Sequence, residues 1–426
     1  MTFMTRTFIG FIFAVEPIWV PLLIVDAATL LVLVFKERFD PRTLIFWVSA
    51  TVILPFLGTV LYVLFGCTLI SGHIFGRKRA SDIGPGQCLH GAATDVRPYA
   101  SFSDALSDMT ADIGAGHTVH MMFRSIPRDP EFHRAVSDAA RSGKEVLLMT
   151  SAFGFGRTHG LRRLRDAGVE YATFRSRVVS MLSLRPANRN MRAMVVIDGT
   201  VAYICPGAVL RLDGPSAASA EMRFASDWAF ATGSESDVAA SCGTGDDVSL
   251  ISSGPDCGGE ADAASYYARL LGSSVDRVLI AAPYLTPNDD LYAHVKLLVL
   301  SGADVRILLP RRGAHWHQSW NSLAASNPLM MAGVRVFFTD GPVGSFVIVS
   351  DGKECALSSG SYTTRSLRDD FNLCVSVRSE FVCDAITKDL ELRLSDAAEC
   401  LPEEYRRRSV LDMVKIAASR MLMFLN

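Results

Sequence analysis

Two stretches of the sequence, MVVIDGTVAYI (residues 194–204) and VIVSDGKECAL (residues 347–357), share one pattern. In each, a short apolar run ends in Asp-Gly and a second apolar run follows. Asp-Gly between two such runs predicts a β-hairpin, because these residues tolerate the backbone that a tight turn requires. The pattern therefore predicts the same pair of strands at two places in the chain.

Two more pairs of segments precede these hairpins in the same order. They are Gly143–Val146 with Gly302–Val305, each before an apolar run, and Ala167–Val169 with Ala332–Val334. Short apolar runs that alternate with helical patterns are typical of an α/β fold. Three matched pairs predict two copies of one α/β unit, roughly 100–250 and 250–395, with a Gly/Ser-rich boundary around 232–260.

Composition limits the classes of function. The chain has 426 residues, of which 49% are hydrophobic and 20% charged, and a net charge of −2. This length predicts two or three domains, and the balanced charge gives no sign of the basic surface that nucleic-acid binding needs. The nine cysteines include no C-x-x-C pair, so we expect small buried apolar residues in a reducing compartment rather than disulfides or a zinc site.

The N-terminal region predicts two membrane-spanning helices. Residues 43–66 contain no charged residue, and as one helix this 24-residue stretch would be about 36 Å long, enough to cross a bilayer core of about 30 Å. Residues 17–35 are apolar except for Asp26. An acid inside a membrane is either a functional group or one tolerated against its partner helix, and we favour the second.

Both ends of this hairpin would lie on one side of the membrane. Arg6 and the cluster Arg77–Arg79 lie on that side, and Lys36, Arg38 and Arg42 lie in the loop, which favours a cytoplasmic main body. At the other end of the chain, residues 396–426 carry a basic amphipathic helix. It suits either anionic lipid headgroups or packing on the body of the protein.

The chain resembles the bacterial cardiolipin synthases of the phospholipase D superfamily. The resemblance rests on the N-terminal pair of apolar segments and on SDWAFATG (226–233), SGPD (253–256), APYLTPNDDL (282–291), GADVRILLP (302–310) and TTRSLRDDFNL (363–373). It implies an α/β fold with two transmembrane helices before a tandem pair of phospholipase D-like α/β sandwich domains, with one active site between them. It also implies phosphatidyl transfer between phosphatidylglycerol molecules, without metal or organic cofactor.

This resemblance gives the expected domain limits. They are a transmembrane hairpin over 1–76, a linker over 77–105, phospholipase D-like domains over 106–245 and 246–395, and a C-terminal amphipathic helix over 396–426.

The catalytic motif of that family, His-x-Lys-x4-Asp, is degenerate in both copies. One family histidine attacks phosphorus, the other protonates the leaving alcohol, the lysines bind phosphate oxygens and the aspartates orient the imidazoles. Here the histidine positions hold Met191 and Gly344, and the lysine positions hold Ala193 and Phe346. Only the aspartates, Asp198 and Asp351, remain.

Further departures surround these positions. Arg192 lies between Met191 and Ala193, but successive side chains of a strand alternate, so Arg192 should point to the opposite face. Ser358–Ser361 replace a Gly-Ser-x-Asn run, and Asn372 replaces the glutamate that follows the aromatic residue at Phe371. A thioether and a glycine cannot form a phosphohistidine, so we expect the family reaction to be lost.

Several other histidines are weaker candidates. His294 and Lys296 imitate the motif, but their spacing and position indicate a helix. His315 and His317, after a strand of the second copy, are possible substitutes for the lost histidines. His117 and His120 precede an apolar run without a third ligand at metal spacing, so we expect hydrogen-bonded core histidines and no metal site.

The leading hypothesis is a membrane-anchored, catalytically degenerate relative of these synthases that binds anionic phospholipid, phosphatidylglycerol or cardiolipin, or serves as a scaffold for an active synthase. The first alternative is an active transferase that uses His315 or His317 with Asp198 or Asp351. The second is a structural membrane protein without a lipid site, which predicts that Met191 and Phe346 fill the cleft.

Overall fold

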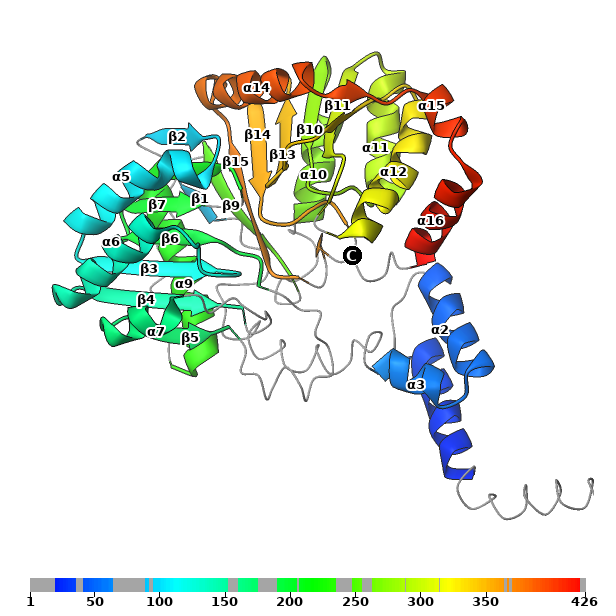
Figure 1. Cartoon of the computed structure of the whole chain (residues 1–426), viewed down its shortest axis with the longest axis horizontal. Helices are drawn as coiled ribbons and strands as arrows, with labels where there is room; N and C mark the ends of the chain where they lie inside the picture. Colours follow the sequence, from blue (N-terminus) through cyan, green and yellow to red (C-terminus); the bar gives the residue numbers. More distant parts are fainter. Residues whose placement is uncertain are drawn as a thin grey trace, which may run out of the picture. The chain divides into compact units, whose positions relative to one another are not determined.

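The computed structural model describes residues 20–35, 41–63, 89–91, 95–151, 160–174, 190–204, 207–234, 247–254, 263–287, 289–313, 315–363, 366–367 and 370–421. The chain forms two compact units. The N-terminal unit comprises Met1–Arg77 with Arg177–Ala187, and the body comprises Lys78–Ser176 with Asn188–Asn426. Figure 1 shows both units, which are described separately below.

The N-terminal unit is a helical hairpin. Residues 20–35 are helical, and α2 (Pro41–Ile53) is the helix that follows them. Leu33 and Trp47, one from each of these helices, are buried in one cluster with Tyr62. The rings of Trp47 and Tyr62 meet edge to face with centroids 5.8 Å apart. Two helices are therefore present in the predicted region, and they pack against each other.

The predicted single helix over 43–66 is wrong, because the helix breaks in its middle. α2 ends at Ile53 and α3 (Leu57–Leu61) begins after a turn in which Phe56 has a φ of 63°. Pro55 has no N–H to continue the helical hydrogen bonds. The 13 residues of α2 extend only about 20 Å, and no helix in the described part of the chain is long and apolar enough to cross a membrane. Residues 17–19 and 64–66 lie outside the described residues.

Asp26 stabilises this break from the neighbouring helix. Its carboxylate accepts hydrogen bonds from the backbone N–H of Phe56 at 2.8 Å and from Thr59 Oγ1 at 2.5 Å. The side chain is buried, so these bonds compensate for its desolvation. Asp26 thus has its hydrogen-bond partners on the second segment of the hairpin. This agrees with the favoured expectation that the acid is tolerated against its partner helix.

The body contains two mixed β-sheets. In the first lobe, the seven-stranded sheet has the order β2-β8-β7-β6-β3-β4-β5. Its strands are β2 (Val96–Tyr99), β3 (Thr118–Phe123), β4 (Glu145–Thr150), β5 (Glu170–Thr173), β6 (Met194–Ile197), β7 (Val201–Ile204) and β8 (Val209–Asp213). The strands β3, β4 and β5 are parallel, whereas β6 is antiparallel to β3.

In the second lobe, the nine-stranded sheet has the order β1-β9-β15-β14-β13-β10-β11-β12-β16. Its strands are β1 (Leu89–Gly91), β9 (Val248–Ser253), β10 (Arg277–Ala281), β11 (Asp304–Pro310), β12 (Arg335–Thr339), β13 (Phe346–Ser350), β14 (Glu354–Ser358), β15 (Asn372–Val377) and β16 (Ala398–Glu399). From β9 to β12 the strands follow the same order as the whole first sheet. The predicted duplication is therefore visible in the topology. The predicted linker, 77–105, contributes β1 to one sheet and β2 to the other.

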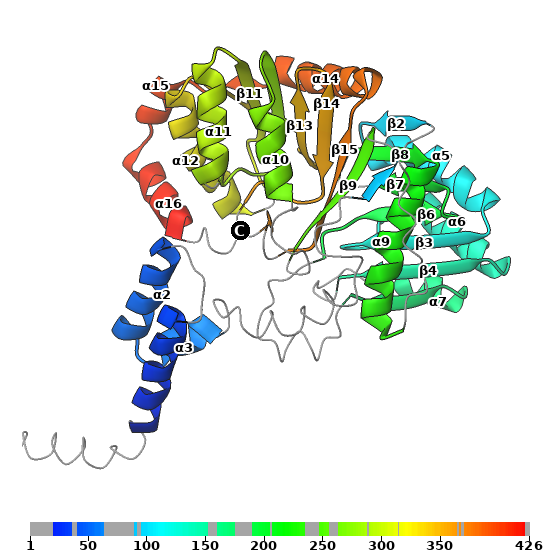
Figure 2. The ribbon, with the colours of Figure 1, turned by 180° about the vertical axis from the view of Figure 1, so that it is seen from behind.

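Helices cover both faces of each sheet (Figures 1 and 2). The first lobe has α5 (Phe102–Ala115), α6 (Pro130–Arg141), α7 (Leu161–Asp166) and α9 (Pro215–Thr232), and the second has α10 (Ala263–Gly272), α11 (Asp289–Leu300), α12 (Trp316–Met331), α14 (Glu380–Ser395), α15 (Pro402–Arg406) and α16 (Val410–Met421). This cover explains why β6 and β13 are apolar and buried along their whole length. The helix α9 contacts β1 and β9 as well as its own sheet, and α14 contacts β2, so each connects the two lobes.

Candidate functional site

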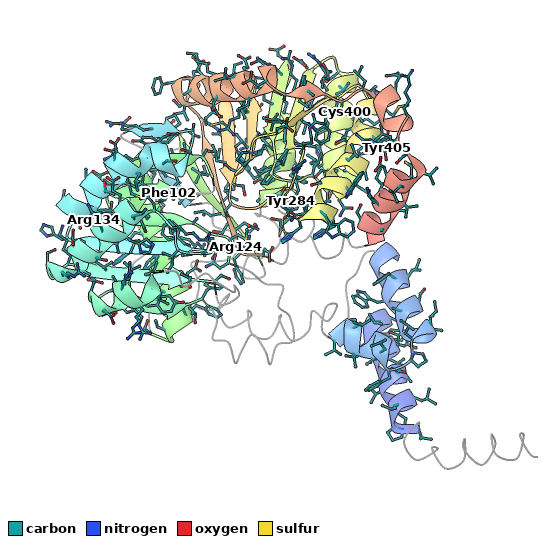
Figure 3. The ribbon with its side chains drawn as sticks, in the orientation of Figure 1. Phe102, Arg124, Arg134, Tyr284, Cys400 and Tyr405 are labelled. Atoms are coloured by element: carbon teal, nitrogen blue, oxygen red, sulfur yellow. The ribbon has the colours of Figure 1, made fainter. Side chains whose placement is uncertain are left out.

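The segments predicted to carry the two motifs begin at equivalent edges of the two sheets. Met194, the first residue of β6, pairs with Met122 near the end of β3, and Val347 of β13 pairs with Ala281 at the end of β10. Arg124 and Tyr284, which follow β3 and β10, mark these edges in Figure 3. Since Asn190 forms a β-bridge with Phe371 of the second lobe, the two lobes meet where the first motif begins.

The first motif is joined to the second lobe through its backbone. The N–H of Met191 donates to the carbonyl oxygen of Phe371 at 2.8 Å. Met191 and Ala193 are half-buried, and Asn190 is fully buried beside them. The positions that would carry the histidine and lysine of this copy thus present a thioether and a methyl group at the junction of the lobes.

Arg192 points away from these two residues, as the strand period predicts. Its guanidinium Nη1 donates to both oxygens of Asp227 on α9, at 2.8 and 2.7 Å, and neither side chain has any exposed area. Its Nε donates to the carbonyl oxygen of Asn372 at 3.3 Å, and the guanidinium lies 5.3 Å from the centroid of the Phe371 ring. Arg192 therefore connects both lobes and takes no part in an open phosphate site.

The second motif is filled by an aromatic cluster. Phe346, at the lysine position, has no exposed area and packs against Tyr267 and Tyr362, with ring centroids 5.3 and 5.9 Å away. Tyr267 is equally buried, and this burial raises the pKa of its hydroxyl. A lysine in this place would bring an ammonium group among buried rings, at a large desolvation cost. Phe346 instead makes this part of the edge of the second sheet apolar.

Gly344, at the second histidine position, lies against Gly207 of the first lobe. A Cβ atom on Gly344 would lie 3.2 Å from the Cα of Gly207, and a Cβ on Gly207 would lie 2.4 Å from the carbonyl carbon of Gly344. Beside them the N–H of Ala208 donates to Ser345 Oγ at 2.9 Å. The absence of side chains at both glycines thus lets the backbones of the lobes touch at this position.

The two motif aspartates lie at the opposite ends of their strands. Asp198 Oδ1 accepts from the backbone N–H groups of His117 and Thr118, at 2.8 and 2.7 Å, where β3 begins. Because β6 separates Asp198 from Met191, these residues are about 20 Å apart along an extended strand. Burial raises the pKa of Asp198, but the hydrogen bonds from Thr118 and His117 outweigh it and lower the pKa.

Asp351 repeats this arrangement in the second lobe. Its carboxylate accepts from the N–H groups of Val275, Asp276 and Arg277, each at 2.9 Å, where β10 begins. Burial raises its pKa, and these three bonds outweigh that effect and lower it. Asp198 and Asp351 have φ angles of 52° and 49°, as their places in the turns require. Each carboxylate therefore binds the backbone at the start of a neighbouring strand, β3 or β10. Neither reaches the edge of the sheet where the histidines of the family motif would lie.

The candidate substitutes, His315 and His317, lie at the other edge from Asp351. Both follow β11, at the start of α12, and their rings stack with centroids 5.4 Å apart. Because β10 and β11 are parallel and in register, the length of β11, about 20 Å, separates these histidines from the start of β10, where Asp351 is bonded. The structure does not bring the histidines and this aspartate together.

The structure meets the expectations for His294 and His120 but not for His117. His117 is exposed at the start of β3, where its backbone N–H, not its ring, bonds to Asp198. His294 of α11 is half-buried, with Nδ1 2.7 Å from the carbonyl oxygen of Asp290. His120 of β3 stacks on Phe224 of α9 with ring centroids 5.0 Å apart, and its Nδ1 lies 2.6 Å from Glu221 Oε1. Burial lowers the pKa of His120, but the carboxylates of Glu221 and Glu145 together outweigh this effect and the pKa is raised. No group of three metal-ligating side chains occurs among the described residues.

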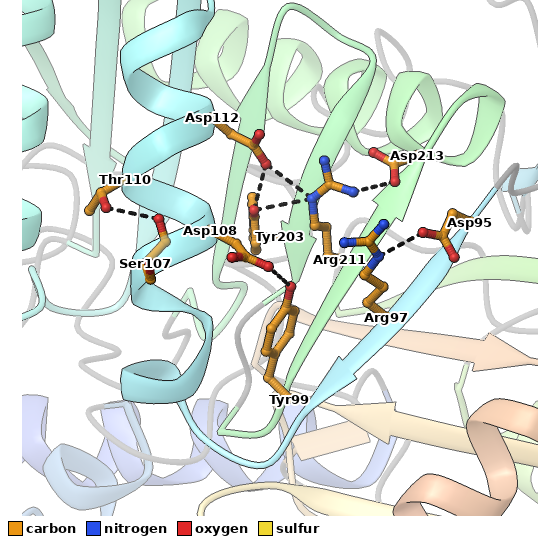
Figure 4. Close-up of polar contacts among 10 residues, drawn as sticks. All are labelled: Asp95, Arg97, Tyr99, Ser107, Asp108, Thr110, Asp112, Tyr203, Arg211 and Asp213. Atoms are coloured by element: carbon orange, nitrogen blue, oxygen red, sulfur yellow. Dashed lines mark hydrogen bonds and ion pairs between the residues drawn. The ribbon is translucent and has the colours of Figure 1, made fainter.

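Sequence reasoning did not foresee a polar network on the first lobe (Figure 4). Arg211 Nε on β8 donates to Asp112 Oδ2 of α5 at 3.0 Å, and Tyr203 Oη on β7 donates to the same oxygen at 2.6 Å. Tyr99 donates to Asp108 at 2.6 Å, and burial and this bond raise its pKa to about 12. These bonds attach α5 to the sheet. No local sequence pattern predicts the network, because its hydrogen bonds join residues up to 99 positions apart.

Comparisons with known proteins agree with this architecture. Residues 267–393 match the family model described as cardiolipin synthase, PLD-like domain. The chain is 22% identical to the cardiolipin synthase of Clostridium perfringens (strain SM101 / Type A) over 89% of this chain and 93% of the relative. It is 23% identical to the major cardiolipin synthase ClsA of Bacillus subtilis (strain 168), over 92% and 95%.

A solved structure shares the fold. The phosphatidylserine synthase of Haemophilus influenzae Rd KW20 superimposes with a TM-score of 0.58 at 10% identity, and the match covers 83% of this chain and all of that one. The family model and the curated relatives confirm the predicted resemblance to the cardiolipin synthases.

Proposed function

Because the chain is similar to bacterial cardiolipin synthases along most of its length, we propose that it is a membrane-anchored protein of phospholipid metabolism that has lost phosphatidyl transfer. It takes part as a pseudoenzyme that contacts anionic phospholipid, phosphatidylglycerol or cardiolipin, or as a scaffold for an active synthase. The proposed location is the cell membrane, with the N-terminal hairpin inserted and the body on the cytoplasmic side.

The observation that carries this proposal is the state of the second motif. Phe346 is buried in an aromatic cluster at the lysine position, and Gly344 touches Gly207 at the histidine position. Two-histidine phosphoryl transfer needs a nucleophile, an acid and cations around one phosphate. The side chains at the four motif positions supply none of these groups.

The proposal of membrane anchoring rests on the apolar surface of the hairpin. Large apolar side chains are exposed on both of its helices, among them Leu23, Ile24, Phe35, Ile45 and Ile53. An exposed apolar surface of this extent favours contact with lipid. A broken second helix is compatible with insertion where Asp26 satisfies the freed backbone N–H of Phe56.

An active enzyme with substitute groups remains the alternative to test. It requires His315 or His317 to work with a partner other than Asp351, because that carboxylate is bound at the start of β10. Proton transfer needs a partner within hydrogen-bond reach or one water away.

The test is lipid analysis of a cardiolipin-deficient bacterial host that expresses the full chain. Cardiolipin is quantified by mass spectrometry, with a synthase that has intact motifs as positive control and equal amounts of both proteins in the membrane. We expect the cardiolipin level of the empty vector. Cardiolipin well above that level would overturn the proposal, and a decrease with the His315→Ala, His317→Ala double variant would then support the alternative.

A further inference from the structure

The C-terminal helix α16 is attached to the second lobe by one side. Cys400 and Tyr405, which precede it, are buried in the core of that lobe (Figure 3). Within α16, Ile416 belongs to the same core and Ser419 has no exposed area, and the helix packs along α12. The opposite side of α16 is therefore the outer face of a docked helix.

This outer face is apolar. Val410, Leu411, Met413 and Val414 are all exposed, Val410 by 82% and Val414 by 58%. Ala417 continues the face by one turn. The charged pair of the helix, Asp412 and Lys415, is turned toward the body, since the Lys415 ammonium lies 5.1 Å from the centroid of the Trp320 ring of α12. Single exposed apolar residues are common, but a run on one face of one helix indicates a contact surface.

Basic and aromatic residues border the face. Between α15 and α16, Arg407 is exposed, whereas Arg408 is half-buried with its Nε buried. On α12, Trp316 is 54% exposed and lies one turn before Trp320, on the same side of that helix. Arginine and tryptophan beside an apolar helix face are typical of helices that lie in the interface of an anionic membrane.

We propose that the outer face of α16 docks on the surface of a bilayer that contains anionic phospholipid. Val410, Leu411 and Val414 enter the boundary of the acyl chains, and the exposed Arg407 binds a headgroup phosphate. A second copy of the chain is the less favourable occupant, because it would bring the Arg407 guanidinium groups of two chains toward one surface patch. This inference rests on the proposed membrane location, and it adds a second contact with the bilayer to that of the N-terminal hairpin.

The experiment uses the full chain reconstituted in vesicles that contain a photoreactive group in the acyl chain of phosphatidylglycerol or of phosphatidylcholine. After illumination, mass spectrometry locates labelled peptides. We expect labelling of residues 409–420 in phosphatidylglycerol vesicles, and less in phosphatidylcholine. Leu411→Gln with Val414→Gln should abolish it, and Arg407→Gln should reduce it up to fivefold, which corresponds to about 1 kcal/mol for one arginine at an anionic surface. Val275→Gln, at an apolar residue that is 67% exposed elsewhere on the body, is the matched control.

The possible failures are distinguishable. If residues 20–63 are labelled and residues 409–420 are not, the docking inference is wrong while the membrane location stands. If neither segment is labelled and the chain does not float with the vesicles, the proposed location itself fails. If residues 409–420 remain free of lipid label and the chain sediments as a dimer that Leu411→Gln with Val414→Gln dissociates, a second copy occupies the face and the inference is overturned.

Discussion

The guanidinium of Arg192 and the carboxylate of Asp227 form an ion pair with N–O distances of 2.7 and 2.8 Å, from which water is fully excluded. The pair joins the segment before β6 to α9, and the bond from Arg192 Nε to Asn372 extends it to the second lobe. The cost of desolvating both charges offsets much of their attraction, so a buried pair of this kind adds little net stability. Removing one partner alone is costly, because it leaves the other charge buried without a counter-charge.

Arg192→Met should lower the free energy of unfolding by about 3–5 kcal/mol, because it leaves the Asp227 carboxylate buried without its cation. Urea denaturation of the detergent-solubilised chain measures this difference. The double variant Arg192→Met, Asp227→Leu should recover most of the loss. Arg335→Met is the matched control, since Arg335 forms a similar bidentate pair with Glu399 but is half-exposed, and it should cost at most about 1 kcal/mol. Equal losses for Arg192→Met and Arg335→Met would contradict this assignment.

Gly207→Ala should destabilise the body by about 1–3 kcal/mol, because its new Cβ would lie 2.4 Å from the backbone of Gly344 and the lobes would have to shift. Gly344→Ala should cost less, since its Cβ would lie 3.2 Å from the Cα of Gly207. Thermal unfolding of both variants provides the comparison. Gly272→Ala, where no atom lies within 4 Å of the new Cβ, is the control and should leave the melting temperature almost unchanged. The reverse order of the first two variants would show that the lobes do not meet through these glycines.

Asp351→Asn should destabilise the body most at neutral pH. Asn tolerates the φ of 49° and keeps one acceptor oxygen for Asp276 and Arg277, so the variant removes the charge together with the acceptor for the Val275 N–H. A carboxyl whose pKa is lowered by folding contributes stability above its unfolded pKa, near 3.9, and that contribution disappears as the pH falls through the folded pKa. The difference between the wild-type chain and the variant in urea denaturation should therefore shrink below about pH 4. A pH-independent difference would show that the charge is unimportant.

His120→Gln should give a stability difference with the opposite pH dependence. Folding raises the pKa of His120, so its contribution is complete below the unfolded pKa of about 6.5 and disappears as the pH rises through the folded pKa. Unfolding measured between about pH 5 and pH 9 should show the variant approaching the wild-type stability at the alkaline end. His294→Gln, at a half-buried histidine whose ring bonds to a carbonyl oxygen of its own helix, is the matched control and should change stability by less than about 0.5 kcal/mol. A difference that grows with pH would reverse the assigned role of the Glu221 contact.

Local sequence pattern was sufficient for the repeated α/β unit, for the hairpins at Asp198 and Asp351, and for the direction of Arg192. Each of these follows from periods of two or from turn chemistry, which neighbours along the chain determine. Which residues occupy the predicted motif positions is likewise a property of the sequence itself.

Contacts between residues far apart in the chain decided the rest. The aromatic cluster around Phe346 draws on Tyr267, and the glycine contact joins residues 207 and 344. The break after Ile53 was missed because an uncharged apolar run predicts a continuous helix, whereas the acceptor for the freed N–H of Phe56 is Asp26 on another helix. The sequence by itself determined which chemical groups are present at the predicted motif positions, because the identity of a residue does not depend on the fold. Only the tertiary structure decided what occupies their place, because packing and hydrogen bonding across the lobes depend on which distant segments the fold brings together.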